Sequence, residues 1–266
     1  HYNKTVPLVG DIALTLDKLN GVLRPLNAAR QGAASRWLDA CFQKREEWLE
    51  FKAQRYAVPG LLDPAWGREV LTQPVAIKTV SDWARSNNAV SFFDAGDVQA
   101  NGFQIVEDDR LGRTFTETGA SYMGFAVSAL LATAVTAHPF FGVAFTGDGS
   151  FTMCPQILID GVMHGARGCI VLFDNRRMGA ISGLQDAQFG CGHATWDTVE
   201  VDYVAWANSV IDVQGLFGGY SVKDLLVALD KALVYDGLSL VHVPVYFGPG
   251  PSSALIGNSA SRSAST

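Results

Sequence analysis

Asp148 and Asn175 are the two residues whose types and positions best suit metal chemistry. Asp148 lies in the run Gly147-Asp148-Gly149-Ser150, directly after the apolar, β-branched run Val143–Thr146. Asn175 comes shortly after a second apolar run, Cys169–Phe173. Carboxylate and amide oxygens are ligands that Mg²⁺ prefers, and this ion usually keeps phosphate oxygens and water as its other ligands. The two residues therefore predict a magnesium site that takes a phosphorylated ligand.

The segments around these residues predict a strand, a glycine turn, a helix and a second strand. Pro155 is suited to the first turn of the helix, where an N–H group has no partner to lose. A right-handed crossover brings the ends of both strands, with Asp148 and Asn175, to the carboxyl edge of one parallel sheet. The free amides of Gly149 and Ser150 and the helix dipole favour a diphosphate beside the metal. An ordinary α/β turn without a ligand is the alternative for this stretch.

The spacing of the motif resembles a known cofactor site. Gly147-Asp148-Gly149-Ser150, with Asn175 lying 27 positions after Asp148 (175 − 148), is similar to the thiamine-diphosphate motif of the acetolactate synthase and pyruvate decarboxylase superfamily. The resemblance implies thiamine diphosphate and Mg²⁺ as cofactors. It also implies three metal ligands: the side chains of Asp148 and Asn175 and the main-chain carbonyl of Arg177. Asp174 replaces a first Asn that many relatives have, and Arg177 replaces a frequent Gly, but neither change removes a side-chain ligand.

The resemblance implies an α/β fold, a parallel sheet with helices on both faces. Ala89–Phe93 is expected to be a buried strand, and Asp94–Asn101 the loop at its carboxyl end. In the family this loop lies against the diphosphate, which makes Gly96, Asp97 and Val98 candidate cofactor contacts. A surface loop without a ligand is the alternative.

A second informative stretch is Gly119–Gly124, where small residues precede an alanine-rich helix. Glycine and other small residues allow backbone to approach a flat ligand closely. In the family a bulky apolar residue before a Gly bends the cofactor, and Met123 matches that catalytic wedge. The carbonyl of Ser121 and the N–H of Met123 are expected to face the aminopyrimidine. Core packing is the alternative for Met123.

The segment Met178–His193 contains four glycines, which predicts a mobile segment over the site. His193 is a candidate proton-transfer group or a surface residue, and His164 is expected to be structural. The complete set of candidate cofactor-binding residues is Gly96, Asp97, Val98, Ser121, Met123, Gly147, Asp148, Gly149, Ser150, Asn175 and Met178.

The composition excludes several classes of function. The chain has 266 residues, 48% apolar and 17% charged, with a net charge of −6 and no basic block, which argues against a nucleic-acid partner. No apolar run reaches the eighteen or so residues that span a bilayer. Four cysteines without a C-x-x-C pair predict reduced thiols and a cytoplasmic location. The first residue is His1 rather than Met, so the sequence is expected to lack its true beginning.

Three parts are expected along the chain. Residues 1–71 are interpreted as a central-domain remnant, with a strand at Val6–Asp11, a helix at Ala33–Arg55 and a linker at Val58–Pro74. Residues 72–249 form the diphosphate- and Mg²⁺-binding domain. The Ser-, Ala- and Gly-rich tail, residues 250–266, is expected to be flexible. The resemblance thus covers the C-terminal half of a family enzyme.

The expected activity is cleavage or formation of a C–C bond next to a carbonyl, of the 2-oxoacid decarboxylation or carboligation type. Thr116–Gly124 and Met178–Leu184 look most like trihydroxycyclohexane-dione hydrolases, so ring-opening hydrolysis of a cyclic 1,2-dione is an alternative. A non-catalytic cofactor-binding subunit and a Rossmann-like nucleotide binder also stay open, although G-D-G-S differs from G-x-G-x-x-G.

The resemblance further implies a partner. In the family a Glu on a separate pyrimidine-binding domain activates the cofactor across a subunit interface, and this chain is too short to contain that domain. We expect a second chain, or a missing N-terminal half of the same protein, to supply it, in a dimer of heterodimers or a larger assembly. If no such chain exists, Glu117 is the first acid to test.

Overall fold

The computed structural model describes residues 4–28, 31–197 and 199–246. The chain forms two compact units that divide between Phe51 and Lys52. Each unit is described separately below.

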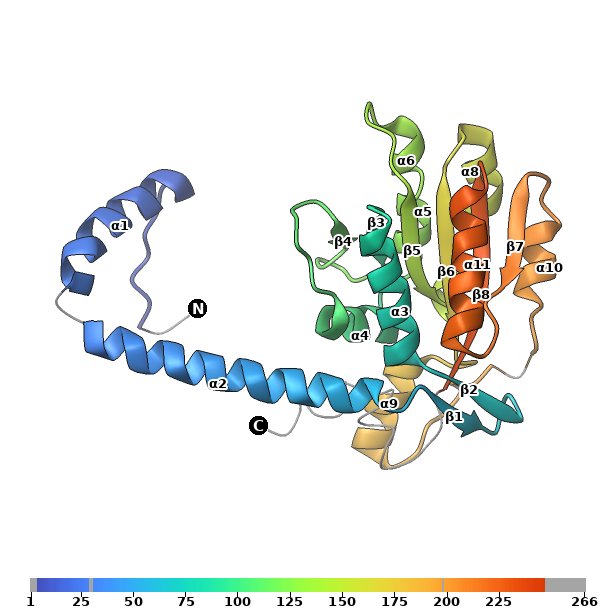
Figure 1. Cartoon of the computed structure of the whole chain (residues 1–266), viewed down its shortest axis with the longest axis horizontal. Helices are drawn as coiled ribbons and strands as arrows, with labels where there is room; N and C mark the ends of the chain where they lie inside the picture. Colours follow the sequence, from blue (N-terminus) through green and yellow to red (C-terminus); the bar gives the residue numbers. More distant parts are fainter. Residues whose placement is uncertain (1–3, 29–30, 198, 247–266) are drawn as a thin grey trace. The chain divides into compact units, whose positions relative to one another are not determined.

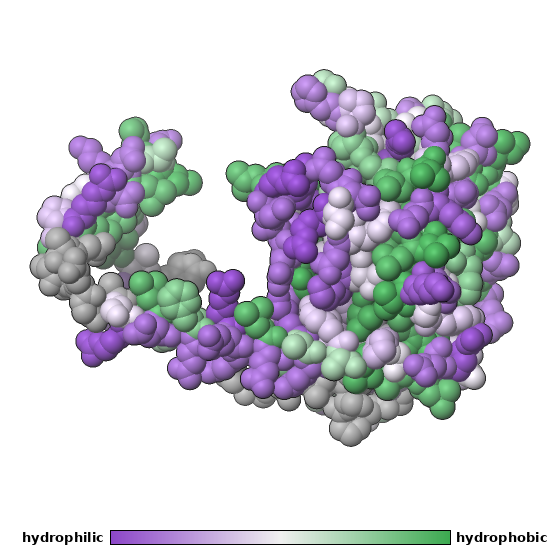
Figure 2. All heavy atoms as spheres, in the orientation of Figure 1, coloured by the Kyte–Doolittle hydropathy of each residue, from purple (hydrophilic) through white to green (hydrophobic). Residues whose placement is uncertain are grey.

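The N-terminal unit is helical. Helix α1 spans Ile12–Ala28, and α2 spans Gln31–Tyr56, close to the expected helix at Ala33–Arg55. The expected strand at Val6–Asp11 is wrong, since residues 5–9 have no regular structure and helix begins at Ile12. A strand needs a neighbouring strand for its hydrogen bonds, and the described part of this unit supplies none. Figure 2 shows apolar and polar residues side by side on α1 and α2, where large side chains such as Leu14 and Trp37 are exposed.

The second unit is built on an eight-stranded sheet with the order β1-β2-β8-β6-β5-β3-β4, in which β7 also pairs with β8 (Figure 1). Its strands are β1 Gly60–Asp63, β2 Arg68–Thr72, β3 Val90–Phe93, β4 Thr114–Thr116, β5 Gly142–Gly147, β6 Gly168–Asp174, β7 Val213–Phe217 and β8 Leu238–Tyr246. Every pairing is parallel except that of β1 with β2. Strand β7 pairs with β8 along Leu238–His242, and β2 pairs with it at Val245 and Tyr246.

Nine helices of the described residues cover or connect these strands: α3 Gln73–Ser86, α4 Asp97–Ile105, α5 Phe125–Ala129, α6 Ala132–Val135, α7 Asp148–Phe151, α8 Ile157–His164, α9 Gly179–Phe189, α10 Tyr203–Asn208 and α11 Val222–Val234. Local chemistry explains several helix ends. The Ser221 side chain accepts a hydrogen bond from the N–H of Asp224 and caps α11, and Pro74 lies in the first turn of α3. Gly165 ends α8 with a left-handed φ of 70°. None of the described helices has both the length and the apolar character needed to cross a membrane.

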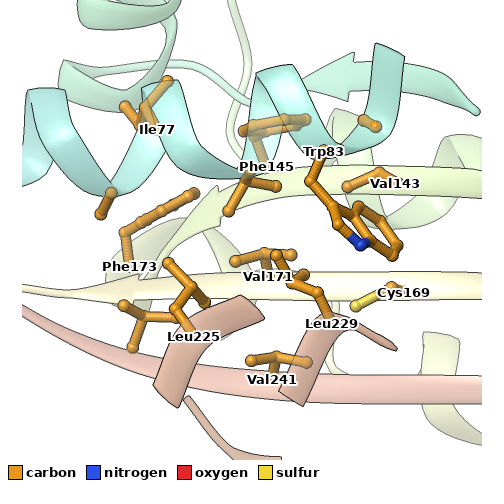
Figure 3. Packing of buried hydrophobic residues seen from close by; sticks show 14 of the residues in the cluster. Ile77, Trp83, Val143, Phe145, Cys169, Val171, Phe173, Leu225, Leu229 and Val241 are labelled. Atoms are coloured by element: carbon orange, nitrogen blue, oxygen red, sulfur yellow. The ribbon is translucent and has the colours of Figure 1, made fainter. Parts of the chain in front are cut away.

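One face of the sheet packs against α3, α4 and α11. Figure 3 shows Ile77 and Trp83 of α3 and Leu225 and Leu229 of α11 lying over apolar strand residues. The strand residues labelled there are Val143, Phe145, Cys169, Val171, Phe173 and Val241. Near the carboxyl ends of β3, β5 and β6, the rings of Phe93, Phe145 and Phe173 stack, with centroid separations of 4.1 Å and 6.1 Å. Burying one such side chain contributes about 1.5–3 kcal/mol, so these rings fix the three strand ends that carry the site.

The opposite face packs against α5, α8 and α10. Ala144, Ile170 and Leu172 point to this side, while their neighbours along β5 and β6 point to the other, as the two-residue period of a strand requires. The expected parallel α/β sheet with helices on both faces is therefore confirmed.

Three expectations about local structure need correction. The expected linker at Val58–Pro74 is the β1–β2 hairpin, which joins the sheet through β8. Its prolines lie outside the strand bodies, at positions where no ladder hydrogen bond is lost. The hairpin consequently belongs with the α/β unit and not with the N-terminal segment.

The expected loop Asp94–Asn101 is also shorter than expected, since α4 begins at Asp97. The alanine-rich helix expected after Gly119–Gly124 is divided into two short helices, α5 and α6. The tail, residues 250–266, lies outside the described residues.

Candidate functional site

The carboxyl ends of β3, β5 and β6 surround a cavity of about 210 Å³. All of the candidate cofactor-binding residues and metal ligands line it: Gly96, Asp97, Val98, Ser121, Met123, Gly147, Asp148, Gly149, Ser150, Asn175, Arg177 and Met178. The parallel sheet thus brings four separate segments of the sequence together. Their individual roles stay predictions.

Other residues of the cavity had not been anticipated: Gln73, Ala95, Phe173, Gly179, Ala180 and Ile181. Gly179, Ala180 and Ile181 are the first residues of α9, so this segment lines the site as a regular helix. The glycines that predicted a mobile segment lie in this helix and just after it.

Asp148 is the first residue of α7, a single helical turn that directly follows β5. Its side chain is buried, and its Oδ2 atom has no hydrogen-bond partner. Burial, followed by the charge of the neighbouring Asp174, raises the pKa of Asp148 well above its ordinary value. A buried carboxylate oxygen without a partner is costly, and a bound cation would stabilise it.

Asn175 and Arg177 complete the expected ligand set. The Asn175 side-chain oxygen accepts a hydrogen bond of 3.1 Å from the N–H of Arg177, which closes a turn at the end of β6. Arg176, at the centre of this turn, has a left-handed φ of 54°. The carbonyl of Arg176 and the N–H of Met178 bond across to the Thr195–Asp197 segment. The N–H and carbonyl of a trans peptide point to opposite sides, so the Arg177 carbonyl, which shares a peptide with the Met178 N–H, points away from the Thr195–Asp197 segment.

Asp174 has a specific partner. Its Oδ2 atom lies 2.9 Å from Nε2 of His242, and its Oδ1 atom accepts a hydrogen bond of 3.0 Å from the N–H of Arg176. His242 lies in β8 among the rings of Tyr203, Phe217 and Trp66. The histidine thus holds the acidic residue that replaces the frequent Asn, next to Asp148. Sequence reasoning missed this partner because 68 residues separate the two positions.

Asp97 is the second carboxyl of the cavity with an unsatisfied atom. Its Oδ2 is buried without a hydrogen-bond partner at the start of α4. Burial raises the pKa of Asp97 to about 7. A Cβ atom on Gly179 would collide with this oxygen, so the first turn of α9 approaches Asp97 closely only because residue 179 is a glycine.

Asp94 connects the parts of the site beneath the cavity. Its side chain is fully buried and accepts hydrogen bonds from the N–H of Gly124 at 2.7 Å and from the hydroxyl of Thr146 at 2.8 Å. Burial raises the pKa of Asp94, and the hydrogen bonds from Thr146 and Gly124 oppose this effect. Asp94 follows a buried strand directly, which is the same signal that identified Asp148.

Met123 projects toward the glycine turn. A Cβ atom on Gly149 would lie 3.3 Å from the Cε of Met123 and 3.0 Å from the Sδ of Met178. The two thioethers therefore flank Gly149, and its lack of a side chain keeps the space between them open. Ser121 and Gly124, on either side of Met123, have left-handed φ values of 52° and 94°. Such a conformation is unusual for serine and is typical of functional loops.

His193 does not line the cavity. Its backbone N–H donates to the side chain of Gln185 at 2.6 Å, and the residue is exposed. His164 ends α8 and is likewise outside the cavity.

The site suits thiamine diphosphate and Mg²⁺ on the chemistry of its own residues. The unsatisfied oxygen of Asp148, in a cavity that Asn175 also lines, is suited to a divalent cation, and the open backbone at Gly149 is suited to a diphosphate. Met123, Met178 and Ile181 give the cavity an apolar part for an aromatic ring.

Two of the curated relatives that align with most of the chain differ in their named activity. One is 3D-(3,5/4)-trihydroxycyclohexane-1,2-dione hydrolase from Bacillus velezensis, 26% identical over 256 residues. The other is acetolactate synthase isozyme 2 large subunit from Escherichia coli, 28% identical over 243 residues. Each alignment covers 90% of this chain and 40% of the relative. The chain therefore spans about 40% of the length of the curated relatives it matches.

A solved structure shares the fold. Benzoylformate decarboxylase from Polynucleobacter necessarius superposes with a TM-score of 0.61 at 18% identity, over 68% of this chain and 34% of that protein. The likeness at this identity concerns the fold alone. Residues 94–243, which contain every candidate cofactor-binding residue, match the family described as "Thiamine pyrophosphate enzyme, C-terminal TPP binding domain". The chain belongs to this family of thiamine-diphosphate enzymes.

Proposed function

We propose that this chain is the diphosphate- and Mg²⁺-binding component of an enzyme that breaks or forms a C–C bond next to a carbonyl group. The observation that carries the proposal is the unsatisfied oxygen of Asp148, in a cavity that Asn175 and Met123 also line. When bound, thiamine diphosphate supplies a carbanion that adds to carbonyl carbon and stabilises the charge left by C–C cleavage.

The protein residues have binding and orienting roles in this proposal. Asp148, Asn175 and the Arg177 carbonyl hold Mg²⁺, and the metal with the amides of Gly149 and Ser150 holds the diphosphate. Ser150 is anchored by its hydroxyl, which donates to the carbonyl of Ala95 at 3.3 Å. Binding of the diphosphate there would hold the rest of the cofactor in the cavity that Met123 lines.

Two substrate classes follow from the named relatives. The Escherichia coli relative favours carboligation or decarboxylation of 2-oxo acids, and the Bacillus velezensis relative favours ring-opening hydrolysis of a cyclic 1,2-dione. The hydrolase name also belongs to relatives in Bacillus subtilis and Bacillus licheniformis, which supports the second class. Assays of both substrate classes in the same preparation, with acetolactate and the opened ring as products, separate the two.

We further propose that a pyrimidine-binding domain covers the cavity and donates an activating carboxylate. This domain belongs to a second chain or to a further part of the same polypeptide, and two copies of each part make the smallest assembly. Tyr122 and Ile181 support the proposal, since these large side chains are 54% and 45% exposed beside the cavity. The four cysteines are all free thiols, in agreement with the reducing cytoplasm that we propose as location.

The 266-residue chain alone should therefore bind cofactor weakly and show no C–C cleaving or joining activity. Activity should appear when a pyrimidine-binding domain with its Glu is added, because the chain supplies only one wall of the site. Steady-state assays with and without the added domain measure this difference. Turnover by the isolated chain would contradict the need for a partner.

Met123→Ala should lower turnover per bound cofactor by more than its effect on folding explains. The substitution removes the side chain that flanks Gly149 and leaves space where the cofactor ring is expected. Burial of Met123 is only partial, so its loss should cost less than the 2–5 kcal/mol that is typical of a fully buried Met→Ala change. Turnover and urea unfolding of the same preparations are the measurements. A matched control is Met153→Ala, an exposed methionine outside the cavity. If only stability falls, Met123 is a packing residue.

A further inference from the structure

The segment 117–124 carries two residues of the cavity, Ser121 and Met123, yet it has no regular structure between β4 and α5. Hydrogen bonds from side chains take the place of secondary structure there. At its end, the N–H of Gly124 is bonded to the buried carboxylate of Asp94. The beginning of the segment is held by a different pair of residues, Glu117 and Gln99.

The carboxylate of Glu117 folds back onto the backbone that follows it. One oxygen, Oε1, accepts from the N–H groups of Gly119 at 2.6 Å and Ala120 at 3.1 Å. The other, Oε2, accepts from Ala120 at 2.9 Å and from the N–H of Ser121. Three consecutive amides therefore point at one anion. Charged hydrogen bonds of this kind are about twice as strong as neutral ones.

Gln99 ties the same segment to α4. Its amide nitrogen donates to the Thr116 hydroxyl at 2.6 Å and to the Glu117 carbonyl at 3.2 Å, and its amide oxygen accepts from the Ser121 hydroxyl at 3.0 Å. Gln99 lies in the first turn of α4, two positions after Asp97. The Gln99 side chain thus connects α4, which begins at Asp97, with the segment that carries Met123.

These contacts determine the backbone at Ser121. A left-handed φ of 52° is unfavourable for serine in an unrestrained loop. Here the Ser121 N–H is bonded to Glu117 and its hydroxyl to Gln99, so both sides of the residue are held. The conformation of Ser121 in turn sets the direction of the backbone that reaches Met123.

We infer that Glu117, with Gln99, is a positioning residue that preorganises the 117–121 backbone for the aminopyrimidine half of the cofactor. The inference rests on the proposed function. Glu117 is unsuited to activate the cofactor itself, because both of its oxygens are engaged by amides of its own loop. Partial desolvation raises the pKa of Glu117, but the amides of Ala120, Gly119 and Ser121 outweigh it and lower that pKa, so the group stays ionised at neutral pH.

Glu117→Gln is a sharp test, because the amide keeps the shape of the side chain but replaces one acceptor oxygen with an NH₂ donor. Whichever way the amide turns, one end faces an N–H group that it cannot accept from. Titration calorimetry in the presence of Mg²⁺ measures the affinity of each protein for two ligands in separate experiments. One ligand is thiamine diphosphate, and the other is inorganic pyrophosphate. Both are measured with the full chain, in the assembly in which the unsubstituted protein binds thiamine diphosphate.

The expected result is a loss of about tenfold or more in affinity for thiamine diphosphate, equivalent to about 1.4 kcal/mol, with affinity for pyrophosphate unchanged. A residue that only stabilises the fold would not separate the two ligands in this way. Gln99→Ala leaves Glu117 intact and should also lower the affinity for thiamine diphosphate relative to the affinity for pyrophosphate. Glu107→Gln is the matched control, since Glu107 pairs with Lys52 outside the cavity and should change neither affinity.

Equal losses for both ligands, or no loss for either, would overturn the inference. Hydrogen exchange of residues 119–121 gives an independent readout in the absence of ligand. Exchange should become faster in Glu117→Gln than in Glu107→Gln, and equal rates would also contradict the role of Glu117. If the unsubstituted protein binds neither ligand, the proposed function itself fails. If it binds both and Glu117→Gln binds both equally well, only the inference about Glu117 is wrong.

Discussion

Replacing Asp148 with Ala should abolish Mg²⁺-dependent binding of thiamine diphosphate. The change removes a buried carboxylate whose unsatisfied oxygen belongs to the cavity that Asn175 also lines. Loss of a residue that only orients a metal ligand already costs about 10–100-fold in metal affinity, so loss of a direct ligand should exceed about 100-fold. Calorimetry with thiamine diphosphate, at fixed Mg²⁺ and with any required partner present, measures the effect.

Two further variants sharpen this test. Asp148→Asn keeps an oxygen ligand without the charge and should bind more weakly than the unsubstituted protein but better than Asp148→Ala. Asp109→Ala removes an exposed aspartate that pairs with Arg110 away from the cavity, and it should bind normally. Unchanged affinity in Asp148→Ala would refute the assignment of the metal site.

Asp97→Asn should stabilise the cofactor-free protein at pH 8 and have little effect at pH 4. Burial raises the pKa of Asp97 from its ordinary value near 3.8 to about 7 in the folded protein. The folded state holds the proton of Asp97 more tightly than the unfolded state does. The contribution of this group to the free energy of unfolding is therefore complete below about pH 4, and it is lost as the pH rises through 7. The corresponding cost of ionisation at pH 8 is at most about 4 kcal/mol, and the asparagine variant avoids it.

Urea unfolding of both proteins between pH 4 and pH 8 tests this prediction. The unsubstituted protein should lose stability across this interval relative to Asp97→Asn, so the difference between the two curves should grow with pH. Asp109→Asn serves as the control, since Asp109 is exposed and should give parallel curves. A constant difference at every pH would mean that Asp97 titrates normally in the folded protein.

The position of Asp148 and Asn175 in one cavity could be predicted because it follows from two local patterns and one general rule. Each residue comes shortly after an apolar strand, and parallel strands in a right-handed crossover end at the same edge. Other candidate residues of the cavity, such as Gly96, Ser121 and Met123, were predicted from the resemblance to thiamine-diphosphate enzymes and not from this rule. By contrast, two features depend on which distant segments fold over that edge. These are the contact of Asp174 with His242 and the position of the first turn of α9 in the cavity. His242 is in the middle of a buried strand, where sequence alone indicates only packing.

The contacts of Asp94 within the site could not be predicted from the sequence either. Its position after β3 resembles that of Asp148, but its role depends on bonds to Gly124 and Thr146, which lie 30 and 52 residues away. The β1–β2 hairpin was missed because its glycine and proline residues are typical of linkers as well as of turns. The expected strand at Val6–Asp11 had a suitable apolar pattern, but a pattern forms a strand only where another strand can pair with it.

The outer strands of the sheet have a consequence for how the protein can assemble. Strand β4 has three residues, β1 has four and β7 has five. Edge strands this short present few unpaired backbone groups, so the described sheet is a poor template for the addition of a foreign strand. A fibre-like or continuous-sheet association is accordingly disfavoured. Contacts with other chains should be made by side chains of helices and loops, which makes such contacts sensitive to single substitutions and specific for one partner.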